Sequence, residues 1–238
     1  MADANRLQYL EAMGIEVWTL RRSPAPEQLI LPEPVEDETV AIGLSEQDSV
    51  ASPESEWEKL QAEVAACRKC GLCEGRTQAV FGTGDDRADW MIIGEAPGKS
   101  EDEQGVPFVG RAGQLLTEML RAVGLTREEV FITNIVKCRP PNNRDPKPEE
   151  AEACFGYLER QLAWIKPKII LAVGRIAAQS LLKTDQPLSR LRGAVHHLDD
   201  TPVIVIYHPA YLLRSLLEKR KAWDDLQLAM ATYNAIKG

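Results

Sequence analysis

The stretch Trp90–Gly113, WMIIGEAPGKSEDEQGVPFVGRAG, decides how the rest of the chain is interpreted. Its apolar run, residues 90–93, predicts a short buried strand, and the chain then enters the glycine- and proline-rich segment 94–98. In an open α/β sheet, ligands bind beyond the carboxyl ends of parallel strands, where a glycine-rich loop turns backbone N–H groups toward them. We therefore predict that a binding site is built directly after this strand.

Strands and helices alternate along the rest of the chain. Apolar runs predict further strands at 80–84, 130–136, 168–173 and 203–207. Helical spacing of apolar residues predicts helices starting near residue 58 and at 113–123, 149–165, 176–182 and 223–235. This alternation predicts an α/β fold, a three-layer sandwich around a mostly parallel central sheet of about four strands.

Charge and composition divide the chain into three parts. Residues 1–60 hold 13 acidic and 4 basic side chains of a protein whose net charge is −8, so residues 61–238 are close to neutral. We expect an amphipathic docking segment at 1–24, an acidic, Pro- and Ser-rich flexible tether at 25–56, and a folded domain at 57–238. No apolar run is long enough to span a bilayer and no signal peptide is evident, so a cytoplasmic protein is expected.

Four features follow predicted strands and should gather at one sheet edge: the loop 94–98, Phe108, Asn134 and His208. An aromatic face, an amide, backbone N–H groups and an imidazole suit a pocket for a planar heterocycle. The adjacent acceptor and donor of an asparagine amide match uracil and mismatch cytosine, whose pattern is reversed. An enzyme that acts on a base within DNA must flip it into such a pocket.

Five cysteines suggest a metal site, because structural disulfides are not expected in a reducing compartment. Three of them, Cys67, Cys70 and Cys73, fall within seven residues. These three alone are compatible with a zinc knuckle or a radical-type cluster, and the alternative is a set of thiols buried as small hydrophobes.

Three motifs carry a family resemblance: GEAPGKSEDEQGVPFVGRAGQLL from Gly94, TNIVKCRPPNNRDPKPEE from Thr133 and HPAYLLR from His208. With four of the cysteines, they resemble the family 4 uracil-DNA glycosylases, the iron–sulfur branch of the uracil-DNA glycosylase superfamily, over residues 57–238. The resemblance implies the superfamily fold and a monofunctional enzyme of base-excision repair that hydrolyses the N-glycosidic bond of uracil in DNA, leaving an abasic site. It also implies a [4Fe–4S] cluster, whose ligands are Cys67, Cys70, Cys138 and Cys154; Cys73 is left over.

The resemblance assigns roles to individual residues. Glu95 and the backbone of Ala96 and Gly98 line the uracil pocket, Phe108 stacks on the base, Asn134 reads it, and His208 donates to the uracil O2. The residues implied to enter the DNA groove are Tyr211, Leu212, Leu213 and Arg214, and those implied to face phosphates are Arg139, Arg144 and Lys147. Ala96 stands where better-known relatives carry a carboxylate that orients the attacking water. Activation of that water is therefore expected from Glu95, from Glu101 or from backbone groups alone. The loop 137–150 has no histidine, so covalent capture of DNA is not expected.

A second resemblance concerns residues 5–22, NRLQYLEAMGIEVWTLRR. This segment resembles the amino-terminal peptide of the psi subunit of the bacterial DNA polymerase III clamp loader, which binds the chi subunit. It implies that the chi-binding anchors are Leu10, Ile15, Trp18 and Leu20. The protein is further expected to be bacterial, nucleoid-associated when it acts, and a monomer apart from its partners. The alternative for the segment is an extra helix packed on the body. The alternative for the whole protein is a replisome-associated DNA-binding adaptor with a weakly active or inactive glycosylase-like body.

Overall fold

The computed structural model describes residues 55–237. The predicted docking segment at 1–24, with its anchors Leu10, Ile15, Trp18 and Leu20, and nearly all of the tether lie outside the described residues. The first described element is helix α2 (Glu56–Ala66), for which Ser55 is the N-cap. The Ser55 hydroxyl accepts from the Glu58 N–H at 3.2 Å, and the Glu58 carboxylate accepts from the Ser55 N–H at 2.7 Å. This capping box starts the helix one residue before the predicted domain boundary.

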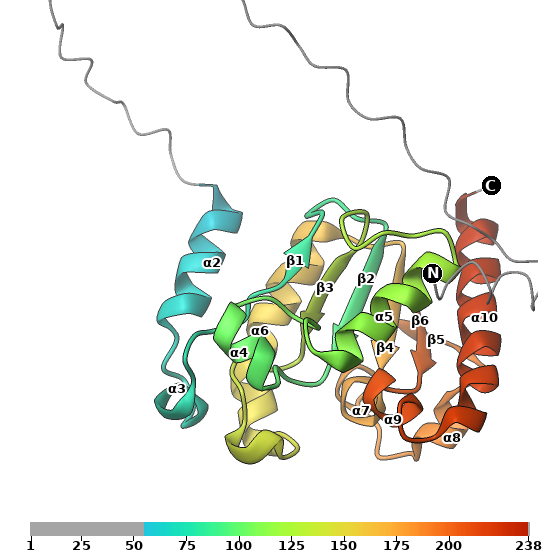
Figure 1. The fold of residues 1–238 in the computed structure, drawn as a ribbon. Coiled ribbons are helices and arrows are strands. Elements are labelled where there is room, and N and C mark those ends of the chain that lie inside the picture. Colours follow the sequence, from blue (N-terminus) through green and yellow to red (C-terminus); the bar gives the residue numbers. More distant parts are fainter. Residues whose placement is uncertain (1–54, 238) are drawn as a thin grey trace, which may run out of the picture. The chain divides into compact units, whose positions relative to one another are not determined.

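Within residues 55–237, one six-stranded sheet has the order β1-β3-β2-β4-β6-β5 (Figure 1). The four inner strands are parallel: β3 (Phe131–Asn134), β2 (Trp90–Gly94), β4 (Ile169–Val173) and β6 (Thr201–Ile206). The edges are the short antiparallel strands β1 (Thr83–Gly84) and β5 (Val195–Leu198). The mostly parallel sheet is confirmed, but it has six strands where about four were expected, and the edge strand β5 was not predicted.

Helices cover both faces of the sheet, so the three-layer sandwich is confirmed (Figure 1). One core contains Ile92 of β2 and packs against α5 (Arg111–Ala122) and α10 (Lys219–Lys237). The other contains the neighbouring β2 residues Met91 and Ile93 and packs against α2, α6 (Pro148–Ile165) and α7 (Arg175–Leu182). Successive residues of β2 thus enter opposite cores, which explains why the strand reads as a continuous apolar run.

Short helical elements occupy the connections. They are α3 (Leu72–Gly75), α4 (Lys99–Gln104), η1 (Pro141–Asn143), α8 (Leu188–Leu191), α9 (Pro209–Leu212) and η2 (Leu216–Glu218). The first helix predicted after Gly94 is 113–123, so α4 was not predicted. No described helix is long and apolar enough to cross a membrane.

The carboxyl ends of the parallel strands form one edge of the sheet. Gly94, the last residue of β2, lies beside Asn134, the last residue of β3. Strand β6 ends two residues before His208, and α4 and α9 lie at this same end of the domain (Figure 1). The topology therefore brings together residues that are far apart in the sequence.

Candidate active site

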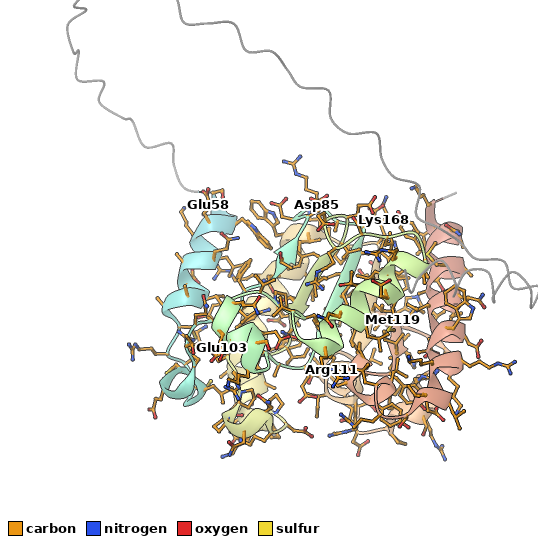
Figure 2. All side chains as sticks on the ribbon, in the orientation of Figure 1. Glu58, Asp85, Glu103, Arg111, Met119 and Lys168 are labelled. Atoms are coloured by element: carbon orange, nitrogen blue, oxygen red, sulfur yellow. The ribbon has the colours of Figure 1, made fainter. Side chains whose placement is uncertain are left out.

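A cavity of about 630 Å³ opens at this edge of the sheet. The predicted site residues that line it are Glu95, Ala96, Gly98, Glu101, Phe108, Asn134, Arg144, His208, Tyr211 and Arg214. The predicted DNA-facing residues Arg139, Lys147, Leu212 and Leu213 are not among its lining residues. Arg111, a lining residue not singled out from the sequence, begins α5 at the end of the domain opposite Asp85 and Lys168 (Figure 2). The cavity has the size of ordinary small-molecule pockets.

Gly94 allows two side chains to meet at the end of β2. A Cβ at this position would lie 2.4 Å from the Asn134 Oδ1 and 2.6 Å from the Phe108 Cζ. Both side chains are buried, with Asn134 only 2% and Phe108 only 7% exposed. A glycine is therefore needed here so that the amide and the aromatic ring can lie against the strand end.

His208 lies beside the Phe108 ring, with ring centroids 5.7 Å apart and planes inclined by 29°. Its Nδ1 accepts a hydrogen bond from the Ala210 N–H at 3.1 Å, which caps the short helix α9. Burial lowers the pKa of His208 to about 4, with a further contribution from the Arg214 cation and an opposing one from Glu101. The imidazole is therefore neutral at neutral pH, and since Nδ1 accepts, its proton is on Nε2.

Glu95 is a half-buried carboxyl in the cavity wall. Burial, with a further contribution from the negative charge of Asp145, raises the pKa of Glu95 to about 7, against the opposing effect of the Arg175 cation. Arg175 and Asp145 form an ion pair at 2.6 Å. A carboxyl that titrates near neutral pH is suited to accept a proton from a reacting group.

Glu101 has a different environment. Its carboxylate accepts from the backbone N–H groups of Gly98 at 3.1 Å, Val109 at 2.9 Å and Gly110 at 2.9 Å. These three bonds join the start of α4 to the segment that precedes α5. The geometry is that of a carboxylate that fixes the shape of the loop.

Comparison with known proteins identifies the family. A model described as the uracil DNA glycosylase superfamily matches residues 81–227. The chain belongs to this superfamily. The Type-4 uracil-DNA glycosylase of Archaeoglobus fulgidus is 50% identical over 159 residues, covering 63% of this chain and 80% of the relative. The corresponding protein of Pyrobaculum aerophilum is 46% identical over 179 residues, covering 72% and 91%. That of Thermotoga maritima is 43% identical over 176 residues, covering 72% and 92%. The family resemblance of the three motifs is thus confirmed.

The segment after His208 in this superfamily member differs from the sequence expectation. Leu212 is only 1% exposed and packs in the core beside α10, so the expectation that it enters DNA is wrong. Tyr211 is 37% exposed, whereas Leu216 and Leu217 of η2 are 64% and 92% exposed. Neither leucine is among the DNA-facing residues predicted from the sequence. The signal that could have indicated their exposure is a pair of leucines in a polar stretch for which no core-facing helix was predicted.

The basic residues of the loop before α6 are partly engaged with neighbours. Arg144 makes two hydrogen bonds, of 2.8 and 2.6 Å, to the carboxylate of Glu150. The Arg139 Nε donates to the Asn143 Oδ1 at 2.7 Å. Lys147, whose ammonium lies 3.9 Å from Glu149, is exposed. The Arg144–Glu150 pair thus holds the loop on the first turn of α6.

Cys138 and Cys154 are buried in the core on the α2 and α6 side of the sheet, and Cys67 and Cys70 pack against the same core. Cys70 and Cys154 lie close enough to Cys138 to influence its pKa, and Cys67 and Cys70 likewise influence that of Cys154. The Arg76 Nη1 donates to the Cys138 Sγ at 2.8 Å, and the Lys137 N–H donates to the Cys154 Sγ at 3.3 Å. Burial raises the pKa of Cys138 to about 11, an effect that Arg76 opposes. Between Ser55 and Lys237, no three His, Cys, Asp or Glu side chains are placed to hold a single metal ion. A cluster of several irons separates its ligands more widely than one ion does, and N–H donors to sulfur suit thiolates, so this donor set fits an iron–sulfur cluster.

Proposed function

We propose that this chain is a monofunctional uracil-DNA glycosylase, which flips uracil out of DNA and hydrolyses its N-glycosidic bond. The observation that carries the proposal is the convergence of Phe108, Asn134 and His208 on one cavity at the sheet edge. The three relatives cited above, each named as a Type-4 uracil-DNA glycosylase, support the same activity. Base-excision repair is the process in which such an enzyme acts.

Recognition rests on two buried side chains. The Phe108 ring offers a face on which the flipped base stacks, and the Asn134 amide pairs with the adjacent carbonyl and N–H of uracil. Cytosine presents the opposite donor and acceptor order, which leaves the buried amide unpaired. These contacts offset part of the free energy lost when the base leaves the stack.

The reaction breaks the bond between C1′ of the sugar and N1 of uracil. The bonding electrons leave with the base, which becomes an anion whose negative charge is shared with O2. The neutral His208 stabilises this anion by donating a hydrogen bond from its Nε2–H to that oxygen. A water molecule adds to C1′ through its oxygen and gives one of its protons to Glu95, which releases it to solvent. The uracil anion takes up a proton from solvent, so that the products are free uracil and an abasic site. A general base contributes ~10²–10⁴-fold to such a step. Among the two candidate carboxylates, Glu95 is favoured, because the oxygens of Glu101 already accept three backbone N–H groups.

The cofactor in this proposal is a [4Fe–4S] cluster held by the thiolates of Cys67, Cys70, Cys138 and Cys154. Bound there, it would join three parts of the chain: the segment after α2, the residues that follow β3 and the second turn of α6. Its contribution is a cross-link that stabilises the loop carrying Arg139 and Arg144. Cys73 is not assigned as a ligand.

DNA contacts are proposed for the rim of the cavity. Arg139, Arg144 and Lys147 are assigned to phosphates, and Tyr211, Leu213 and Arg214 to the groove. The exposed Leu217 replaces the buried Leu212 as the apolar wedge that fills the place of the flipped base.

A tether to the replisome is a further part of the proposal, supported by the resemblance of residues 5–22 to the psi peptide. In that arrangement the chi subunit of the bacterial clamp loader is the partner, and the enzyme works at the nucleoid. Chi should retain the full-length protein in a pulldown and lose it when Trp18 is changed to alanine. Retention that survives Trp18→Ala would contradict the tether.

The activity is tested with anaerobically purified protein and a uracil-containing oligonucleotide, followed by alkali to cut abasic sites. Asn134→Ala serves as the control, and cleavage that depends on Asn134 is the expected result. Cluster-replete protein that binds the oligonucleotide without cleaving it would overturn the proposal and favour a DNA-binding adaptor.

A further inference from the structure

Phe108 has an unusual backbone conformation. Its φ is +54°, in the left-handed region that bulky side chains rarely adopt, although its side chain is buried. Such a conformation persists only where the surrounding structure holds it, and it often marks a functional position. The ring that is assigned to uracil stacking therefore depends on groups that fix its backbone.

One of these groups is the guanidinium of Arg127, which follows α5 in the sequence. The Arg127 Nη2 donates to the Pro107 carbonyl at 2.7 Å, and its Nη1 donates to the Phe108 carbonyl at 3.1 Å. The same Nη1 lies 3.4 Å from the hydroxyl of Thr117 on α5. The planar guanidinium can serve two neighbouring carbonyls at once because its donors lie in a fixed fork.

The first turn of α5 supplies the second support. A Cβ at Gly113 would lie 1.7 Å from the Phe108 carbonyl oxygen, so the helix backbone and the Phe108 backbone are in direct contact. The Phe108 carbonyl is thus enclosed by the Gly113 backbone and the Arg127 guanidinium. Residues from two sides of the α5 region determine how this one peptide unit is oriented.

Arg127 is half-buried and is not among the residues that line the cavity. It belongs to none of the three motifs that carry the family resemblance. A direct contact with the base is therefore not its role, and any influence on catalysis passes through Phe108.

We infer that Arg127 is a positioning residue, which holds Phe108 in the left-handed conformation that presents its ring to the flipped uracil. This inference rests on the proposed glycosylase function. Loss of the guanidinium leaves two carbonyls without their donor and allows the Phe108 peptide to relax toward ordinary backbone angles. The ring then shifts within the pocket, while the surface that contacts DNA phosphates is unchanged.

The test compares Arg127→Met with Arg121→Met in the full-length, cluster-containing protein. Arg121 is the second-last residue of α5, six residues before Arg127; it is exposed and pairs with Glu118 at 2.8 Å, so it is a matched control. We expect Arg127→Met to lower the single-turnover rate of uracil excision about 10- to 100-fold, as small misplacements of positioned groups do. Arg121→Met should retain the wild-type rate, and both variants should bind a thymine-containing duplex as tightly as the wild type.

A double-mutant cycle separates positioning from general destabilisation. In a Phe108→Ala background there is no ring to position, so Arg127→Met should cause no further loss of rate. Arg127→Lys, which retains one cationic donor group, should recover part of the rate. It also carries the test if Arg127→Met does not fold.

Three outcomes would overturn the inference. They are a wild-type excision rate in folded Arg127→Met, losses that multiply in the double variant, and a loss confined to affinity for both duplexes. If the wild-type protein itself releases no uracil, the proposed function fails instead, so the two failures are distinguishable.

Discussion

Replacing Glu95 by glutamine should change both the rate of uracil excision and its dependence on pH. Burial and Asp145 raise the pKa of Glu95 from the ordinary 4.5 to about 7. A carboxyl accepts a proton from water only in its ionised form, so excision should increase with pH and level off above this pKa. At about pH 6, one unit below the pKa, roughly 10% of Glu95 is ionised, and the rate should be about one tenth of its plateau. A carboxyl with the ordinary pKa would be almost fully ionised at that pH and would give a flat profile.

Glu95→Gln keeps the shape of the side chain but cannot accept the proton. We expect the plateau rate to fall ~10²–10⁴-fold and the rise with pH to disappear. The assay is single-turnover excision from a labelled uracil oligonucleotide with enzyme in excess, in buffers spanning the neutral range.

Two neighbours of Glu95 should move the midpoint of the rise in rate with pH in opposite directions. Asp145→Asn removes a charge that raises the pKa and should shift the rise to lower pH, whereas Arg175→Met should shift it to higher pH.

Glu101→Gln is the control for the other carboxylate. It weakens the bonds to three backbone N–H groups and should lower the rate without moving the midpoint. A flat wild-type profile, or a Glu95→Gln profile with the wild-type slope, would refute the reasoning. If the pH dependence were lost only in the Glu101→Gln variant, Glu101 would be the carboxylate that accepts the proton from water.

Three further expectations concern packing, cofactor and DNA. Gly113→Ala should lower the free energy of unfolding by about 3 kcal/mol or more, because its Cβ would overlap a carbonyl oxygen at 1.7 Å. Gly156→Ala, in open space within α6, should raise the free energy of unfolding by roughly 0.5–1 kcal/mol. Thermal unfolding of the two cluster-containing variants and the wild type measures both effects. Cys138→Ser should reduce the iron content and visible absorption of anaerobically purified protein, whereas Cys73→Ser should leave both unchanged, and iron retained in Cys138→Ser would contradict the ligand assignment. Leu217→Ser should change stability by less than about 0.5 kcal/mol, since the side chain is 92% exposed. It should nevertheless slow excision from duplex DNA more than from single strands, and equal effects on both would argue against a wedge.

The inner sheet and the membership of the site could be predicted because both follow from strand ends. Strands buried on both faces are continuous apolar runs, and the carboxyl ends of parallel strands must meet at one edge. Asn134 and His208 are separated by more than seventy residues in the sequence, yet each lies at or just after such an end, and both line the same cavity.

What could not be predicted depends on side-chain orientation and on local hydrogen bonds. Helix α4 has no apolar residue, and its start is fixed by the Glu101 carboxylate, which a periodicity argument does not detect. Strand β5 contains His196 and His197 and alternates between exposed and half-buried positions, so it lacks the apolar signal. Leu212 turns inward because the short helix α9 directs it into the core, whereas a linear motif treats it like its neighbours.

The form of the two sheet edges has a consequence for the behaviour of the chain in solution. Strand β1 has two residues and strand β5 has four, and each pairs antiparallel with a buried parallel strand. Short edge strands are poor templates for pairing with a strand of another molecule, so these two edges disfavour edge-to-edge association between copies of the chain. A cut or deletion that removes β5 would uncover β6, whose residues 202–206 are all buried, as an open apolar edge. Damage to the β5–β6 hairpin, which ends two residues before His208, should therefore expose a strand edge through which copies of the domain associate.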